Sequence, residues 1–163
     1  MTTKAAFSED EWTRLKRGPF IAGLAISLAD PGGPIEAIKE TAATLKTVTG
    51  AADSGTRGEF VGVIAGEVSE EARHRKNPLS GFKPKGAMAG QEILDELRAV
   101  NGIVSEKATP EEAEAYRAWL LAAAKEAADA AKEGGFMGFH AERVSEGEQR
   151  MLDQLAGVLA APA

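Results

Sequence analysis

Glu71 and His74 have the i, i+3 spacing by which helical bundles place a carboxylate and an imidazole on one metal ion. A di-iron site of the ferritin type needs two such motifs and two further glutamates from facing helices. The other histidine, His140, has Met137 three residues before it, so the second motif is missing. We therefore interpret Glu71 and His74 as an exposed pair at the end of a helix, and we predict no metal site.

No pattern of catalytic residues in the sequence is complete. His140-x-Glu142 matches the first half of a zinc-deaminase signature, but the chain has no cysteine to complete it. No serine occurs in a nucleophile-elbow context, and the glycine-rich stretch 55–66 matches neither the P-loop nor the dinucleotide fingerprint. We predict no catalytic residue and no cofactor, and the lack of cysteine excludes disulfides.

The strongest candidate for binding chemistry is a basic segment, because no acidic residue occurs between Ala72 and Gln91. This segment carries +5, so the remainder of a chain whose net charge is −6 carries −11 (−6 minus +5). A phosphate or carboxylate could bind there, helped by exposed amides at the start of the helix near Gly86. The alternative is a solvated loop that balances an acidic neighbour. The candidate ligand-binding residues are Arg73, Arg75, Lys76, Lys83 and Lys85.

A second candidate is the loop 134–140, which has three glycines among apolar residues. The glycines free the backbone to adopt positive φ, whereas Phe136, Met137 and Phe139 are too apolar for an ordinary solvated connection. We interpret this loop first as a turn whose side chains seal one end of the protein. The functional alternative is a flap over an apolar ligand or a surface for a partner.

The elements that position these residues are predicted to be helices. Alanine is abundant, aromatic residues make up only 6% of the chain, and β-branched runs are scarce. Capping-box pairs at 8–11, 109–112 and 145–148 mark three helix starts. Gly18-Pro19 and Asn101-Gly102 predict a break and an end. The predicted helices cover 8–17, 19–30, 34–49, 59–75, 86–100 and 110–133, followed by a last helix that begins after Ser145.

These helices predict an all-α, single-domain bundle of residues 1–163, with six or seven helices around the apolar helix 19–30. The stretch 59–75 could be a strand on propensity alone, but its apolar residues keep helical spacing. Gly58, Gly62 and Gly66 recur at every fourth position in and beside it. They should form a smooth groove that lets another helix approach closely.

Charge and hydropathy limit the classes of partner. A net charge of −6 and a pI of about 5.1 argue against a general nucleic-acid binder, which needs a clustered positive surface. The longest apolar run, 19–29, is far below the roughly 20 residues that span a bilayer. No apolar segment near the start resembles a secretory signal, so we predict a cytoplasmic protein without a membrane span.

The C-terminal stretch 131–139, together with the helix start Val-Ser-x-x-Glu at 144–148, resembles the tail of an uncharacterised family of small bacterial helical proteins. The same helix start, and the Ala-Asp ending of the helix 19–30, are similar to the tellurite-resistance TerB-like fold. This resemblance implies an all-helical fold. TerB-like domains carry acidic positions after an Asp-Gly pair, but Asp30 is followed here by Pro31, so no site follows from it.

Two functions are compatible with these features. The first is a non-enzymatic interaction or adaptor protein, which would use an exposed apolar or charged patch to bind a partner or a second copy of itself. The alternative is a small-ligand-binding domain. Its ligand would be an anion at the basic segment 73–85 or an apolar molecule under the loop 134–140.

Overall fold

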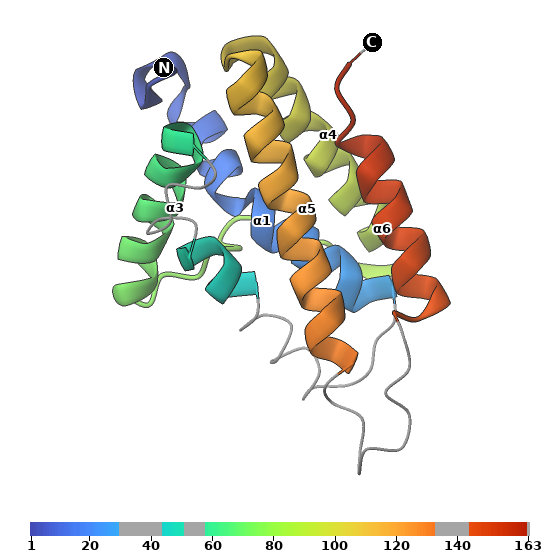
Figure 1. Ribbon diagram of the computed structural model, residues 1–163. Coiled ribbons are helices and arrows are strands. Elements are labelled where there is room, and N and C mark those ends of the chain that lie inside the picture. Colours follow the sequence, from blue (N-terminus) through green and yellow to red (C-terminus); the bar gives the residue numbers. More distant parts are fainter. Residues whose placement is uncertain (30–43, 51–57, 133–143, 163) are drawn as a thin grey trace.

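The computed structural model describes residues 1–29, 44–50, 58–132 and 144–162 (Figure 1). These residues form helices, turns and loops and contain no strand, which confirms the all-α prediction. Residues 44–50 are helical, and the remaining elements are η1 (Lys4–Ala6), α1 (Glu9–Ala29), α3 (Gly58–Arg73), η2 (Gly86–Met88), α4 (Ala89–Lys107), α5 (Pro110–Lys132) and α6 (Glu146–Val158).

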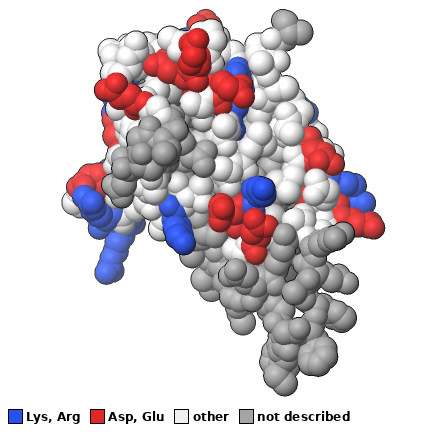
Figure 2. Space-filling model, viewed as in Figure 1, with Lys and Arg blue, Asp and Glu red and all other residues white. Residues whose placement is uncertain are grey.

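Helix α1 lies at the centre of the bundle, as Figure 1 shows, and contacts α3, α4, α5 and α6. Its second half is the apolar helix that the sequence places at the centre. Phe20, Ile21 and Ile26 are all buried there, because this half is surrounded by other helices. Figure 2 shows Lys and Arg side chains gathered at the lower left, where α3 ends in Figure 1, and Asp and Glu side chains gathered at the top.

The predicted break at Gly18-Pro19 is wrong, because α1 continues through it. Pro19 has no N–H, so the carbonyl of Leu15 lacks its usual donor within the helix. The hydroxyl of Tyr116 on α5 donates a hydrogen bond to that carbonyl at 2.7 Å. Gly18 makes room for this contact, since a Cβ there would lie only 2.3 Å from the Tyr116 hydroxyl. Another helix therefore supplies the donor that the proline removes.

The predicted helix end at Asn101-Gly102 is also wrong, because α4 continues to its last residue, Lys107. The Asn101 side chain does not cap the helix. Its amide donates to the carbonyls of Val158 and Ala160, both at 3.0 Å, and its oxygen accepts from Arg117 at 2.7 Å. Asn101 thus ties α4 to α5 and to the end of α6.

The three helix starts that capping boxes mark are confirmed, because all three boxes form in both directions. In each, the first residue accepts from a backbone N–H at 3.2–3.3 Å, and the glutamate accepts in return at 2.7–3.0 Å. The helical interpretation of 59–75 is confirmed by α3. The predicted glycine groove is wrong for the described residues, since a Cβ at Gly58, Gly62 or Gly66 would meet no atom within 4 Å.

Some predictions fall on other parts of the chain. Only the end of the predicted helix 34–49 is described, and it is helical. The loop 134–140, with Phe136, Met137 and Phe139, lies outside the described residues. Among the helices that the structure describes, none is long and apolar enough to cross a membrane.

Candidate ligand-binding cavity

A cavity of about 550 Å³ lies between α1, α3, the helical residues 44–50 and the chain that follows α3. Residues three or four positions apart share one face of a helix, and both α1 and α3 line the cavity with such a face. The lining residues are Thr13, Lys16 and Phe20 on α1; Leu45; Val68, Glu71 and Ala72 on α3; and Arg75, Lys76, Asn77, Pro78 and Ser80 after α3.

One part of the lining is apolar. Phe20 and Val68 belong to the core, with 5% and 4% of their surfaces exposed, and Leu45 packs against that core. Pro78 contributes a further apolar surface from the loop. An apolar ligand surface in contact with these side chains would leave water, which is the main source of affinity in pockets of this kind.

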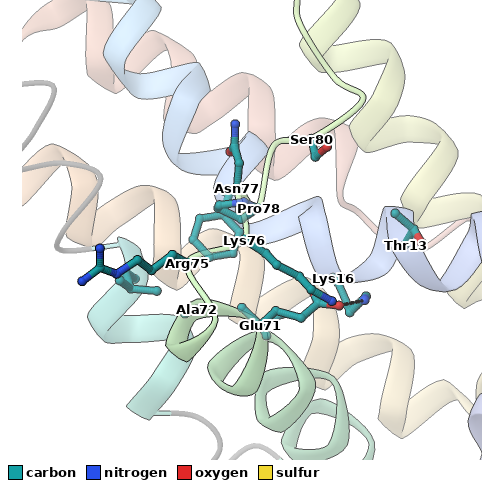
Figure 3. Close-up of a pocket in the computed structure, with 12 residues that line it drawn as sticks. Thr13, Lys16, Glu71, Ala72, Arg75, Lys76, Asn77, Pro78 and Ser80 are labelled. Atoms are coloured by element: carbon teal, nitrogen blue, oxygen red, sulfur yellow. Dashed lines mark hydrogen bonds and ion pairs between the residues drawn. The ribbon is translucent and has the colours of Figure 1, made fainter.

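The charged part of the lining is predominantly cationic. Lys16, Arg75 and Lys76 line the cavity together with a single carboxylate, that of Glu71. Figure 3 shows Lys16 and Glu71 in contact, with the Lys76 side chain extending toward them and Arg75 pointing the opposite way. Within the described part of the chain, Arg75 and Lys76 have no ion-pair partner. The cavity therefore has a surplus of positive charge that a bound anion would balance.

The backbone at the end of α3 places Arg75 and Lys76 beside the cavity. The N–H of Lys76 bonds to the carbonyl of Glu71 at 3.0 Å, and the N–H of Arg75 bonds to that of Ala72 at 2.9 Å. These two bonds form a Schellman motif, whose turning residue adopts the left-handed conformation and is usually glycine. Here that residue is Arg75, with φ of 55°. A side chain at this position strains the backbone, and such strain concentrates at functional sites.

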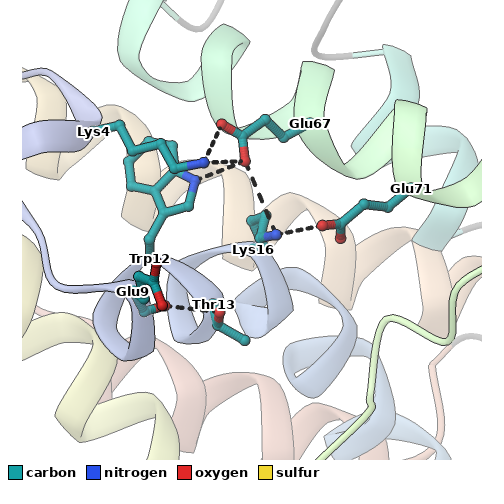
Figure 4. A network of polar contacts seen from close by, with 7 residues as sticks. All are labelled: Lys4, Glu9, Trp12, Thr13, Lys16, Glu67 and Glu71. Atoms are coloured by element: carbon teal, nitrogen blue, oxygen red, sulfur yellow. Dashed lines mark hydrogen bonds and ion pairs between the residues drawn. The ribbon is translucent and has the colours of Figure 1, made fainter.

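A polar network holds Lys16 in the wall of the cavity (Figure 4). The Lys16 Nζ lies 2.5 Å from Glu71 Oε1 and 4.0 Å from Glu67 Oε2. Glu67 also accepts hydrogen bonds from Lys4, at 2.8 and 3.0 Å, and from the Trp12 indole at 2.9 Å. Burial raises the pKa of Glu67, but the bonds from Lys4 and Trp12 outweigh burial, so the net shift of this pKa is downward. The network joins η1, α1 and α3 on one side of the cavity.

The loop on the other side of the cavity is held by Arg17. Its guanidinium donates to the carbonyl of Ser80 at 3.2 Å and to Glu96 on α4 at 3.2 Å, and it lies 5.4 Å from the centre of the Phe82 ring. Arg14 binds the same Glu96 through two bonds, at 2.6 and 2.9 Å. Burial raises the pKa of Glu96, but the interactions with the two arginines outweigh burial, so the net shift of this pKa is downward. Glu96 therefore stays ionised and keeps Arg17 in place.

The predicted basic segment divides into two groups. All five cations are exposed, but Arg75 and Lys76 line the cavity, whereas Lys83 and Lys85 lie outside its lining. Arg73 is 77% exposed and pairs with a neighbouring glutamate at 3.0 Å. The five cations do not converge on one point. Two residues of the segment line the cavity, and the other three lie outside its lining.

The expected exposed pair of Glu71 and His74 does not form a joint site. Glu71 binds Lys16, and the Nε2 of His74 lies 3.1 Å from Glu70. The described residues contain no group of three or more histidines and carboxylates that could hold a metal ion. Glu71 lies in the last turn of α3 and His74 in the turn that follows it, and each pairs with a different residue.

Sequence reasoning missed Lys16 and Phe20 as cavity residues. The predicted break at Gly18-Pro19 put them on different helices, whereas in the continuous α1 their spacing of four residues places them on one face. Leu45 carried no signal beyond that of an amphipathic helix. Only the contact between distant segments gives these residues a common role.

In comparisons with known proteins, no family model matches this chain, and neither does any curated protein or solved structure. The resemblances to a family of small bacterial helical proteins and to the TerB-like fold stay predictions from the sequence. A function must therefore be inferred from the chemistry of the cavity.

Proposed function

We propose that this protein binds a small amphiphilic anion, with an apolar body and one carboxylate or phosphate head group. The observation that carries this proposal is a cavity of about 550 Å³ that combines apolar side chains with three cations and one carboxylate. Ligand sites typically have volumes of about 300–1,000 Å³, with mostly apolar walls and a few placed polar groups. The cavity has both the size and the composition of such a site.

The expected binding mode follows from the charges. Lys16 is already paired with Glu71, so Lys76, which extends toward this pair, is the cation available to a head group there. Arg75 lines the cavity but points the opposite way, so it adds positive charge only at longer range. The apolar body would contact Phe20, Leu45 and other apolar lining residues. A neutral analogue of the same length would gain the apolar contact without the ionic one and should bind more weakly.

Octanoate, octyl phosphate and octanol, each titrated calorimetrically, test this proposal. We expect the two anions to bind more tightly than octanol, and their ratio identifies the preferred head group. Lys76→Ala should weaken anion binding by up to about five-fold, since a partly exposed ion pair contributes up to about 1 kcal/mol. Lys83→Ala and Lys85→Ala, which remove the same charge outside the cavity, should have little effect. Equal binding of octanol and the anions, or equal losses in all three variants, would contradict the proposal.

The alternative, an interaction or adaptor protein, has less support in the described residues. Their large exposed apolar side chains are Met1, Leu28, Val63 and Met88, which belong to four different parts of the chain. Single exposed apolar residues are normal on protein surfaces and do not identify a partner site. The cytoplasmic location and the lack of nucleic-acid binding are expectations that rest on the sequence and its net charge of −6.

A further inference from the structure

A smaller cavity of about 130 Å³ adjoins the first one. Phe20, Asn77 and Pro78 line both cavities, so the two spaces share one wall of three side chains. Figure 3 shows Asn77 and Pro78 at the side of the larger cavity, on the chain that leaves α3. A ligand longer than the first cavity could reach the second along this shared wall.

The chemistry of the smaller cavity differs from that of the larger one. No Lys, Arg, Asp or Glu is among its lining residues in the described part of the chain. Leu24 and Leu79 supply apolar surface, and both pack against the core. On one side α1 and residues 44–50 meet closely, since a Cβ on Gly23 would lie 2.5 Å from the Thr44 hydroxyl. The space therefore suits an alkyl end without charge.

We infer that the smaller cavity holds the end of an unbranched alkyl chain whose anionic head lies near Lys76 in the larger cavity. This inference rests on the proposed function and specifies its ligand as a linear, medium-length amphiphile. Leu79 then determines specificity, because its side chain limits the depth available to the chain end. Shorter anions occupy only the larger cavity and do not contact Leu79.

The test is calorimetric titration with straight-chain carboxylates from butanoate to dodecanoate. For wild-type protein we expect affinity to rise by about four-fold per methylene while carbons are being buried, which corresponds to about 0.8 kcal/mol each. Leu79→Trp should fill the smaller cavity and make this rise stop at a shorter chain, with butanoate affinity unchanged. Leu28→Trp, a change of the same size at a side chain that lines neither cavity, should keep the wild-type profile.

One result would overturn the inference while leaving the proposed function intact: the Leu79→Trp profile is the same as the wild-type profile although binding still depends on Lys76. An affinity that does not change with chain length in the wild-type protein would contradict both proposals, because the apolar body would then contribute nothing to binding. Absence of binding by every carboxylate would likewise reject both proposals. Leu79→Phe, a smaller change with an intermediate expected profile, replaces the tryptophan variant if circular dichroism shows that the latter does not fold.

Discussion

Arg75 illustrates how one residue can combine a cost in stability with a proposed role in binding. Its left-handed conformation, with φ of 55°, is one that glycine adopts freely and that costs a residue with a side chain about 1 kcal/mol or more. The Schellman bonds at the end of α3 impose this conformation. A glycine would satisfy the fold better, so the arginine at this position carries a cost in stability.

We expect Arg75→Gly to raise the free energy of unfolding by about 1 kcal/mol and to lower the affinity for octanoate. Arg75→Ala removes the same charge but keeps a Cβ in the left-handed conformation. It should lower affinity equally without the gain in stability. Urea unfolding and calorimetric titration of the two variants measure these effects. Equal stability of the glycine and alanine variants would show that the backbone is not strained here.

Glu112 makes stability depend on acidity. Burial raises the pKa of its carboxyl, but hydrogen bonds from Thr2 and Thr109 outweigh burial and lower this pKa from 4.5 to about 2. Between these values the unfolded chain binds more protons than the folded one, so the stabilisation is complete above about pH 4.5 and disappears as the pH falls to about 2. Because it accepts from both Thr109 and Thr2, this one carboxylate caps α5 and also ties the N-terminal residues to that helix.

We expect Glu112→Gln to make the free energy of unfolding fall less steeply between pH 4.5 and pH 2, because the substituted side chain has no proton to gain. Urea unfolding at several pH values measures this slope. Glu111→Gln, an exposed neighbour in the same turn, is the matched control and should keep the wild-type slope. Identical slopes in the two variants would mean that Glu112 does not titrate with a lowered pKa.

At the scale of elements, the same substitution should have opposite effects on two helices. Gly18→Ala would place a Cβ 2.3 Å from the Tyr116 hydroxyl, disturbing the bond that replaces the missing donor of Pro19. We expect a loss of about 1–3 kcal/mol, the cost of leaving a buried carbonyl without its donor. Gly62→Ala on α3 meets no atom of the described residues within 4 Å and should gain about 0.5–1 kcal/mol from helix propensity. Urea unfolding gives both values, and a stabilised Gly18→Ala protein would contradict the packing at Tyr116.

The helix starts and the Gly18-Pro19 break show which features of the elements could be predicted from the sequence. Capping boxes such as Ser145 with Glu148 were correctly predicted because both partners lie within one helical turn. The break at Gly18-Pro19 was predicted wrongly because Tyr116 lies 101 residues after the carbonyl it satisfies. A proline predicts a helix end from the local sequence, but the helix can continue where a distant side chain supplies the lost hydrogen bond.

The candidate site follows the same rule. Arg75 and Lys76 could be predicted because they are consecutive members of a basic segment that is visible in the sequence. Lys16 and Phe20 could not, because their role depends on α1 being continuous and on α3 packing beside it. Arg75 and Lys76 follow one another at the end of a single helix, whereas the cavity forms only through the tertiary fold.

For the whole molecule, the distribution of charge favours the proposed ligand. Acidic residues outnumber basic ones, by 25 to 19, yet two of the three cations of the cavity, Arg75 and Lys76, belong to a segment without a single carboxylate. Figure 2 shows a group of Lys and Arg side chains at the lower left of the visible face, whereas both signs are mixed over much of the rest. An anion should be repelled by most of the surface and attracted near the end of α3, so its association should slow as salt screens this field.

The central position of α1 predicts that the described helices unfold together. Because α1 contacts α3, α4, α5 and α6, none of these helices can leave without exposing part of its buried surface. The chain has two tryptophans, Trp12 near the start of α1 and Trp119 in α5, both buried. Trp12→Phe and Trp119→Phe each leave one of them as the fluorescent reporter of its own region.

In each variant, we expect the urea transition followed by tryptophan fluorescence to coincide with that followed by circular dichroism, as for a single cooperative domain. Trp119→Phe should be the milder change, since the Trp119 indole N–H has no hydrogen-bond partner in the described part of the chain, whereas that of Trp12 binds Glu67. Octanoate should shift both curves of a variant to higher urea together, because a ligand that binds only the folded state stabilises the whole cooperative unit. If the Trp12 signal changed before the dichroism, α3 and the start of α1 would form a separate unit, and the cavity between them could open without unfolding of the rest.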